Sequence, residues 1–313
     1  MSLLPVEAAH LLAARPAERR WLIEGLWAEE AVGIVGGEPK CCKSFLALDM
    51  AVAVASGTAC LRRFAVARPG RVLLFAAEDA LHVVRQRLDG ICRAAGVELA
   101  EIDIKVITAP SVRLDVEVDR KSLAETVAAL RPRLLILDPF VRLHRIDENV
   151  SGEVAPLLAY LRELQRRHQL AVVVVHHARK GAGKARAGQA LRGSSEFHAW
   201  GDSNLYLRRV GEQLTLAVEQ RAAASTTGIS LRLNDDNDSV ALEVADDRPN
   251  SEAPTPAIEK RVEQILAAAT EPMTLAEIRA TCRVRNATIQ QLLAALAAAG
   301  RVTRNADGYA LIR

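Results

Sequence analysis

The sequence has few of the residues that mark secreted, metal-stapled or membrane-spanning proteins. Of its 313 residues only 5 are cysteines, and none forms a C-x-x-C pair or a His/Cys cluster with zinc-ligand spacing. We therefore expect neither a disulfide framework nor a structural zinc site, and this cysteine usage suits a reducing cytoplasm. Charged residues interrupt every apolar run well short of a membrane span, and the N-terminus lacks a signal-peptide pattern. The expectation is a cytoplasmic protein without a membrane partner.

Aromatic residues and net charge are also scarce. Aromatic residues make up 4% of the chain whereas 50% is hydrophobic, so Ala, Val and Leu must build the core. The formal net charge of +3 is too small to mark a nucleic-acid binder by itself. The length leaves room for one large domain and one small domain.

Residues 31–245 show short apolar runs that alternate with longer amphipathic segments, which predicts an α/β domain with a mostly parallel sheet. The runs are apolar throughout, as expected for strands that helices cover on both faces. Strands are predicted at residues 32–35, 71–76, 104–107, 134–137 and 170–175. Helices are predicted at residues 45–56, 80–95, 122–130 and 154–168, and a hairpin at residues 203–210 and 213–219 around Gly211. The amphipathic residues 1–30 are predicted to be helical.

Residues 246–256 have the composition of a linker, because they are polar, contain three prolines and lack apolar periodicity. Residues 257–313 behind them are predicted to form a small second domain. Its first helix is expected at residues 257–269. A second helix begins after Thr274, and Glu277 three residues later completes a capping box.

The end of this second domain carries the signals of a third helix and of a hairpin. The helix is predicted from Asn286 or Thr288 to Ala299, and an Asp-Gly pair at residues 307–308 predicts the turn of the hairpin. Three helices followed by a hairpin is the layout of a winged helix, which places its third helix in the major groove of duplex DNA. The Ala-rich third helix is equally typical of a domain that contacts another protein. The basic candidates for DNA contact are Arg285, Arg301 and Arg304.

Residues 37–44 resemble a phosphate-binding loop with one substitution. They read G-E-P-K-C-C-K-S against the pattern G-x-x-x-x-G-K-[ST], so Cys42 replaces the second glycine. A strand before the loop and a helix after it aim backbone N–H groups at one point, where an anion binds. Lys43 would reach the β- and γ-phosphates of ATP, and the Ser44 hydroxyl would hold Mg²⁺. The alternative is a βα turn with a surface lysine. The residues predicted to bind the nucleotide are Gly37, Glu38, Pro39, Lys40, Cys41, Cys42, Lys43, Ser44 and Phe45.

Two further predicted strands end in acidic residues. Asp138 follows the apolar run 134–137, where a carboxylate would support Mg²⁺ beside the Ser44 hydroxyl, or would merely start a turn before a proline. Glu78 follows the run 71–76 and would orient the water that attacks the γ-phosphate. The alternative for Glu78 and its neighbour Asp79 is that one of them caps the next helix.

A histidine pair and a basic segment follow the strand at residues 170–175. One imidazole of His176 and His177 would contact the γ-phosphate, and because adjacent strand residues point to opposite faces, at most one faces the nucleotide. A metal site is the alternative, although no third ligand lies at a recognisable spacing. The glycine-rich segment that follows is typical of a mobile loop that orders on a phosphate backbone, or of a solvated loop. Its candidate DNA contacts are Arg179, Lys180, Lys184 and Arg186.

The order of these motifs over residues 20–245 resembles the RecA-like ATPases of the plasmid RepA hexameric replicative helicase type. That resemblance implies an ATP-driven hexamer around single-stranded DNA. It implies that Lys43 and Ser44 bind phosphate and Mg²⁺, that Glu78 activates water and that Asp138 supports Mg²⁺. It also implies that His177, in preference to His176, senses the γ-phosphate, and that Arg87 lies near the nucleotide.

Two positions depart from the family pattern. Cys42 stands in place of a glycine, and its side chain would crowd the approach of the backbone to phosphate. The arginine that a neighbouring subunit supplies in the family would fall at Asp202, with Arg208 or Arg209 as substitutes if the alignment shifts. Since such an arginine contributes a factor on the order of 10³–10⁵ in rate, its absence predicts a slow ATPase or a switch.

Three functions are therefore open. The first is a DNA-dependent ATPase of the helicase type in replication or recombination. The second is a nucleotide-gated regulator whose winged helix binds duplex DNA or a partner protein. The third is a scaffold with an inactive nucleotide site, which the retained Lys43, Ser44, Glu78 and Asp138 disfavour.

Overall fold

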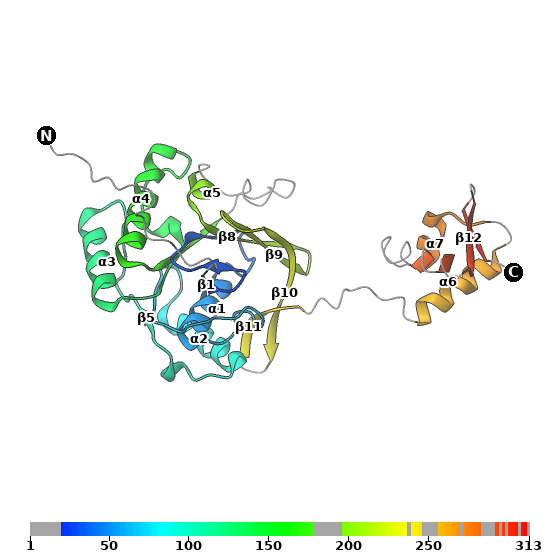
Figure 1. Cartoon of the computed structure of the whole chain (residues 1–313), viewed down its shortest axis with the longest axis horizontal. Helices are drawn as coiled ribbons and strands as arrows, with labels where there is room; N and C mark the ends of the chain where they lie inside the picture. The colour runs from blue at the N-terminus through cyan, green and yellow to red at the C-terminus, as the bar shows by residue number, and fades with distance from the viewer. Residues whose placement is uncertain are drawn as a thin grey trace, which may run out of the picture. The chain divides into compact units, whose positions relative to one another are not determined.

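The computed structural model in Figure 1 describes residues 20–177, 196–236, 239–245, 256–269, 272–282, 292–293, 296–297, 300–305 and 308–311. Contacts between Cα atoms divide the chain into Met1–Ala245 and Asp246–Arg313, at the place where the composition changes to that of a linker. The DNA-contact candidates Arg179, Lys180, Lys184, Arg186 and Arg285 lie outside the described residues, as does the side chain of Arg304. Among the described residues, no helix combines the length and apolar character needed to cross a membrane.

A nine-stranded sheet organises the first unit, with the order β11-β10-β9-β8-β3-β7-β6-β4-β5. Its parallel part contains β3 (Val32–Gly37), β4 (Val72–Ala76), β5 (Ile104–Val106), β6 (Leu134–Asp138), β7 (Ala171–His177) and β8 (Ser203–Val210). The five predicted parallel strands are confirmed. The predicted hairpin is confirmed as β8 and β9 (Gln213–Gln220), and its first strand also pairs in parallel with β3.

Two strands of this sheet were not predicted from the sequence. They are β10 (Thr226–Asp236) and β11 (Ser239–Val244), which extend the sheet in antiparallel fashion. Their sequences contain many polar residues because only one face is covered. Ile229, Leu231, Leu242 and Val244 pack against the core from that face. On the opposite face, Arg232 and Glu243 form an ion pair with each other.

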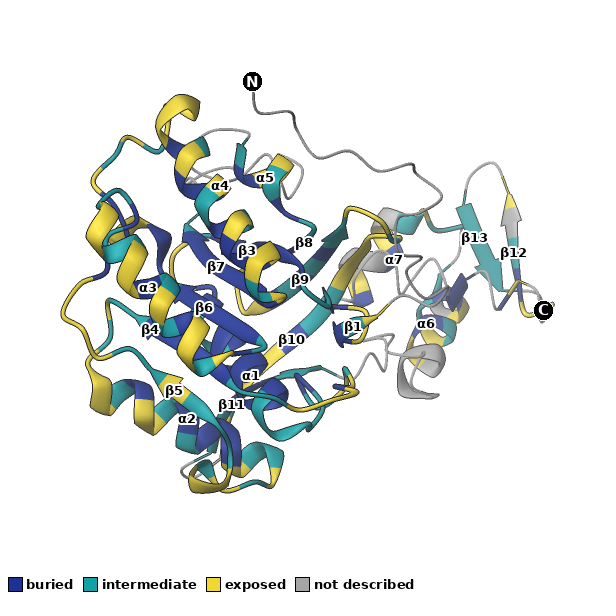
Figure 2. Cartoon of the chain, turned by 60° about the vertical axis from the view of Figure 1, so that its left-hand side comes forward, coloured by how far each residue is buried: buried dark blue, intermediate teal, exposed yellow. Residues whose placement is uncertain are grey.

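Helices cover both faces of the parallel sheet, as the uniformly apolar strands predict (Figure 2). One core cluster joins α1 (Lys43–Ser56) and α2 (Leu81–Ala95) to the sheet. A second cluster on the opposite face contains residues of α3 (Glu117–Leu130), α4 (Ser151–His168) and α5 (Glu196–Trp200). The α/β class and the four predicted helices are confirmed.

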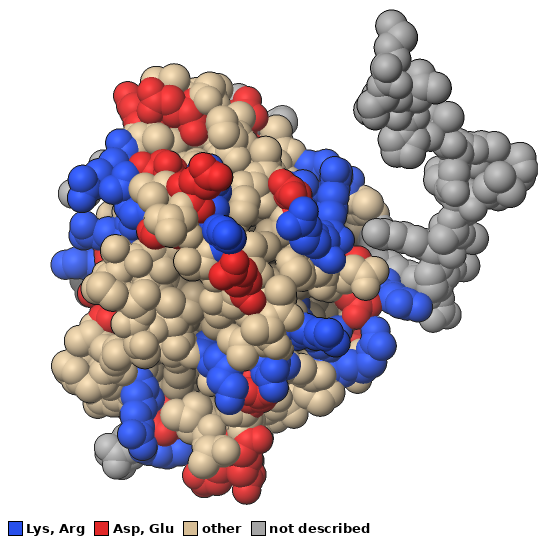
Figure 3. All heavy atoms as spheres, turned by 90° about the vertical axis from the view of Figure 1, so that its left-hand side faces the viewer, with Lys and Arg blue, Asp and Glu red and all other residues tan. Residues whose placement is uncertain are grey.

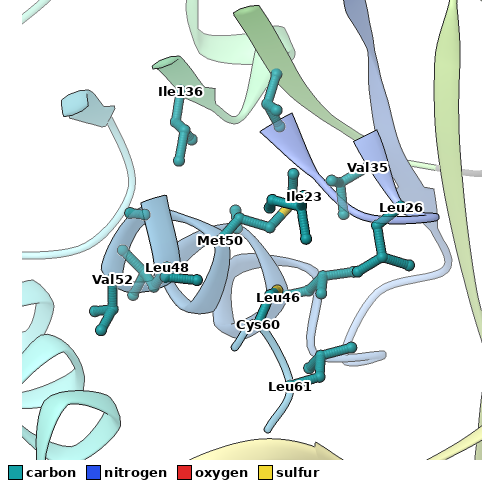
Figure 4. Packing of buried hydrophobic residues seen from close by; sticks show 14 of the residues in the cluster. Ile23, Leu26, Val35, Leu46, Leu48, Met50, Val52, Cys60, Leu61 and Ile136 are labelled. Atoms are coloured by element: carbon teal, nitrogen blue, oxygen red, sulfur yellow. The ribbon is translucent and has the colours of Figure 1, made fainter. Parts of the chain in front are cut away.

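Helix α1, which begins at the end of the phosphate loop, packs into the core of the first unit. Leu46 and Met50 pack in the same cluster as Val35 of β3 and Ile136 of β6 (Figure 4). These side chains are fully buried, and each buried aliphatic side chain contributes roughly 1.5–3 kcal/mol. The start of α1 is therefore anchored firmly beneath the ends of the central strands.

The chain before β3 forms a hairpin, so the prediction of a helical segment at residues 1–30 is wrong for residues 20–30. Strands β1 (Trp21–Ile23) and β2 (Trp27–Ala28) pair around a turn in which Gly25 has φ 71°. Glycine adopts this left-handed conformation without steric cost, and the flanking Trp and Ile residues favour strands. Residues 1–19 lie outside the described part of the chain.

The second unit contains α6 (Pro256–Ala268), α7 (Leu275–Cys282), β12 (Val302–Asn305) and β13 (Gly308–Leu311). The predicted capping box is confirmed: the Thr274 N–H donates to Glu277 Oε2 at 2.8 Å, and the Glu277 N–H donates to Thr274 Oγ1 at 3.4 Å. The predicted third helix lies largely outside the described residues. Its residues Leu292, Leu293 and Leu296 are described and belong to the small core of this unit.

Candidate functional site

The predicted site residues meet at the carboxyl edge of the parallel sheet, on the face that carries α1. Strand alternation explains the shared face, because Ala76, Asp138 and His177 lie two residues after Leu74, Ile136 and Val175, which pack with α1. Parallel strands place all these ends at one edge, where ligands bind in open α/β sheets. A single pocket there is lined by Lys40, Cys42, Lys43, Ser44, Phe45, Ala76, Glu78, Asp79, Arg87, Asp138, Val175 and His177.

The loop between β3 and α1 is shaped by backbone geometry that few residues tolerate. Gly37 has φ 155°, and a Cβ atom there would lie 2.4 Å from the Leu207 carbonyl oxygen and 2.6 Å from Cys41 Sγ. Cys42 has φ 64° and ψ 28°, the left-handed region that glycine occupies at no cost. A glycine is therefore usual here because of the backbone conformation, and Cys42 keeps that conformation with a Cβ atom present.

Cys42 is also the N-cap residue of α1, and its side chain makes no capping hydrogen bond. The first backbone N–H groups of α1 therefore point from the helix end toward the pocket without a side-chain cap. A helix N-terminus in this state attracts an anion through its N–H groups and its dipole. Four of the predicted nucleotide-binding residues belong to the loop but do not line the pocket. They are Gly37, Glu38, Pro39 and Cys41.

Lys43 is buried, which disfavours the alternative of a surface lysine in a βα turn. Only 6% of its surface is exposed, and Nζ donates a hydrogen bond to the Glu38 carbonyl oxygen at 2.8 Å. Burial lowers the pKa of Lys43, whereas the nearby Cys41, Asp138 and Glu78 raise it in part. A buried ammonium group without a full counter-charge is prepared for a phosphate.

Asp138 lies beside Ser44 in the part of the pocket that also holds the acids Glu78 and Asp79. Burial raises the pKa of Asp138 to about 6, a hydrogen bond from Ser44 opposes this rise, and the neighbouring Asp79 and Glu78 add to it. Carboxylate and hydroxyl oxygens are ligands that Mg²⁺ accepts, and a divalent cation would relieve the repulsion among these acids. The donor set therefore fits a Mg²⁺ ion held at Ser44 with support from Asp138.

Glu78 and Asp79 both face arginines rather than capping α2. Ala80 is the N-cap residue of α2 and receives no side-chain cap. Glu78 Oε1 lies 2.9 Å from Nε of Arg142 in the 3-10 helix Phe140–Arg142, and Asp79 forms an ion pair with Arg87. The cap alternative is thus not observed for either acid.

Arg87 is placed in the pocket wall by two contacts. It pairs with Asp79, and its guanidinium carbon lies 5.2 Å from the ring centroid of Phe45. Arg142 belongs to the run after Asp138 that resembles the family, but the sequence did not predict its pairing with Glu78, because that pairing joins two strand ends that lie 64 residues apart.

The two adjacent histidines point to opposite faces of β7. His177 lines the pocket, whereas His176 is 1% exposed and stacks on Phe197 with ring centroids 4.1 Å apart. Behind His176, His144 Nε2 lies 3.3 Å from Glu148 Oε1. Burial alone would raise the pKa of Glu148, but the nearby His144 and His176 imidazoles lower it overall. Only His177 is placed to contact a nucleotide.

Asp202, which stands where the family has the arginine of a neighbouring subunit, has a structural role within this chain. Asp202 precedes β8 at the edge of the sheet opposite the phosphate loop, where its N–H donates to the Val32 carbonyl oxygen at 2.7 Å. Its carboxylate pairs with Arg162 and lies 3.4 Å from Arg221 Nε. Arg209, one of the suggested substitutes, lies instead beside the phosphate loop of its own chain.

These features define a P-loop nucleotide-binding site. A family model described as an AAA domain matches residues 1–183, which is more than half of the chain. The chain belongs to this AAA domain family of P-loop ATPases.

Replacing Cys42 with glycine is expected to stabilise the protein by about 0.5 kcal/mol. The left-handed conformation costs a residue with a Cβ atom about 1–2 kcal/mol, and the extra freedom of an unfolded glycine offsets about 0.5–1 kcal/mol of that gain. Urea unfolding of the nucleotide-free protein measures the difference. Cys42→Ala keeps a Cβ atom, cannot cap the helix and serves as the control, so equal stability of the Gly and Ala variants would contradict this account.

Replacing Asp138 with asparagine is expected to stabilise the nucleotide-free protein near pH 7.5 by about 1–3 kcal/mol. The raised pKa of about 6, against an ordinary 3.8, means that the folded state binds the proton more tightly than the unfolded state. This contribution to stability is therefore complete below pH 4 and is lost as the pH rises through 6.

Unfolding free energies of wild type and Asp138→Asn should accordingly converge near pH 4. Asp147→Asn is the control, because hydrogen bonds from Asn149 lower the pKa of that exposed carboxyl group and no gain is expected. A stability difference for Asp138→Asn that does not change with pH would contradict the assignment.

Proposed function

We propose that this chain is a RecA-like ATPase that acts on DNA as a hexamer, with a role in replication or recombination. The observation that carries the ATPase part is the convergence of Lys43, Ser44, Glu78, Asp138 and His177 on one pocket. The DNA part rests on the basic segment that follows β7 directly, with Arg179, Lys180, Lys184 and Arg186. On the face shown in Figure 3, Lys and Arg side chains are interspersed with Asp and Glu, so this face offers no extended basic track among the described residues.

The residues have distinct roles in the proposed hydrolysis. The N–H groups of the loop and the Lys43 ammonium hold the β- and γ-phosphates, and Ser44 with Asp138 would hold Mg²⁺. When bound, Mg²⁺ neutralises charge on the phosphate oxygens. Glu78 accepts a hydrogen bond from the attacking water, whose oxygen forms a bond to the γ-phosphorus as the bond to ADP breaks. His177 contacts the γ-phosphate and is released when phosphate leaves.

The ion pair between Glu78 and Arg142 bears on the rate of this reaction. Glu78 Oε1 lies 2.9 Å from Arg142 Nε, and both side chains are partly exposed. The carboxylate must turn from the guanidinium toward the water before it can act. This requirement favours slow basal turnover that rises when a ligand such as single-stranded DNA engages Arg142.

ATP hydrolysis with and without single-stranded DNA tests this proposal. Wild type is expected to hydrolyse ATP faster when DNA is present and to elute as a hexamer. Lys43→Ala and Glu78→Gln should each lose roughly 100-fold or more of the turnover, since each removes one catalytic contribution. Lys105→Ala, which removes an exposed lysine of β5, is the matched control and should retain wild-type turnover. Turnover at background that Glu78→Gln leaves unchanged would refute the proposal.

The second candidate function is a nucleotide-gated DNA-binding regulator with weak ATPase activity. Asp202 at the expected arginine position favours it, because that carboxylate is neutralised by Arg162 and Arg221 of its own chain. In this alternative, residues 257–313 act as a winged helix that binds duplex DNA or a partner protein. One of its candidate contacts, Arg301, pairs with Glu263 at 2.5 Å, which would have to open for phosphate binding.

Duplex binding by the full chain and by a chain ending at Ala245 separates the two candidates. The regulator predicts salt-dependent duplex affinity that is lost with the second unit and is preserved in Glu78→Gln. The ATPase motor predicts that single-stranded DNA stimulates turnover in both chains. Equal duplex affinity of the two chains would exclude the regulator.

A further inference from the structure

Arg209 is brought to the phosphate loop by the register of two parallel strands. Strand β8 pairs with β3 so that Leu207 lies opposite Gly37, the last residue before the loop. The two backbones approach so closely that a Cβ atom on Gly37 would lie 2.4 Å from the Leu207 carbonyl oxygen. Arg209 follows two residues later and therefore lies alongside the loop itself.

Strand alternation fixes the direction of the Arg209 side chain. Leu205 and Leu207 of β8 pack in the cluster that contains α1, whereas Tyr206 packs in the cluster on the opposite face. Arg209 shares the face of Leu207, and Arg208 shares the face of Tyr206. In agreement, Arg209 Nη2 lies 3.3 Å from Cys42 Sγ, at the N-cap of the helix that begins with Lys43.

The sheet order places Arg209 and the hydrolytic residues on opposite sides of the loop. Strands β7, β6 and β4, which end in His177, Asp138 and the turn with Glu78, lie on one side of β3, and β8 lies on the other. Neighbouring strands are about 4.8 Å apart, so β8 and β6 are separated by roughly 14 Å. A γ-phosphate beside Asp138 and Glu78 thus lies on the far side of the loop from Arg209. The rest of the nucleotide must extend away from those acids.

We propose that Arg209 binds the nucleotide in its own chain, at the α- and β-phosphates that ATP and ADP share. This inference rests on the proposed function, since it assumes that the pocket holds a nucleotide. A guanidinium group forms charge-assisted hydrogen bonds with phosphate oxygens and does so with a fork geometry that lysine lacks. The sulfur of Cys42, which replaces a glycine, holds the guanidinium over the loop before the nucleotide arrives.

Equilibrium binding of Mg·ADP and of Mg·AMP-PNP, a non-hydrolysable ATP analogue, tests this role in the full-length protein. Arg209→Ala should weaken the affinity for both nucleotides by the same factor, roughly tenfold or more, since it removes a charged hydrogen bond. Turnover at saturating ATP should change less than about twofold, because no contact to the γ-phosphate is lost. The affinity of Arg209→Lys should fall between those of wild type and Arg209→Ala. Arg208→Ala is the control: the Arg208 side chain leaves the other face of β8, so this variant should bind both nucleotides as wild type does.

Each other outcome has a defined meaning. A loss confined to AMP-PNP, or a large fall in turnover at saturation, would place Arg209 at the γ-phosphate and overturn this inference. Wild-type affinity of Arg209→Ala for both nucleotides would also overturn it, provided that Lys43→Ala loses binding in the same assay. If wild type itself binds neither nucleotide and Lys43→Ala is indistinguishable from it, the proposed nucleotide-dependent function fails instead. Arg209 is exposed, so its replacement is not expected to disturb folding.

Discussion

Parallel pairing of β3 with β7 and β8 is the constraint on which the site depends. It sets His177 opposite Gly37 on one side and Leu207 opposite Gly37 on the other. Because side chains alternate along each strand, this single register decides which residues face α1. A shift by one residue would exchange His177 for His176 and would turn Arg209 away from the loop. The buried packing of α1 against Val35 and Ile136 makes such a shift costly, since it would expose the apolar core.

The same packing places the charged groups of Lys43 and Asp138 where they lower the stability of the nucleotide-free protein. Lys43 is buried with its pKa lowered, and Asp138 is partly buried with its pKa raised, so each pays a desolvation cost in the nucleotide-free protein. Cys42 adds backbone strain through its left-handed conformation. A bound phosphate and a divalent cation would compensate these groups together, which links nucleotide binding to the stability of the loop. Asp202, in contrast, lies at the other end of β8 and is neutralised within the chain.

The sequence predicted the central strands and helices because their apolar patterns are local. It also placed the loop, Glu78, Asp138 and His177, since parallel strands bring their carboxyl ends to one edge. The hairpin at residues 21–28 was missed because its amphipathic pattern resembles a helix, and only the turn at Gly25 distinguishes it. Strands β10 and β11 were missed although they alternate apolar and polar residues as half-buried strands do, so this part of the sheet was locally predictable. Arg142 and Arg209 reach the site through pairings between distant segments, which no local pattern encodes.

Amide hydrogen exchange of the full chain with and without Mg·AMP-PNP tests the central claim most directly, namely that one nucleotide engages the loop and three strand ends at once. The account predicts slower exchange together at residues 37–46 and at the carboxyl ends of β4, β6 and β7, with no such change in Lys43→Ala. Protection that is absent from the loop, or that persists in Lys43→Ala, would contradict it.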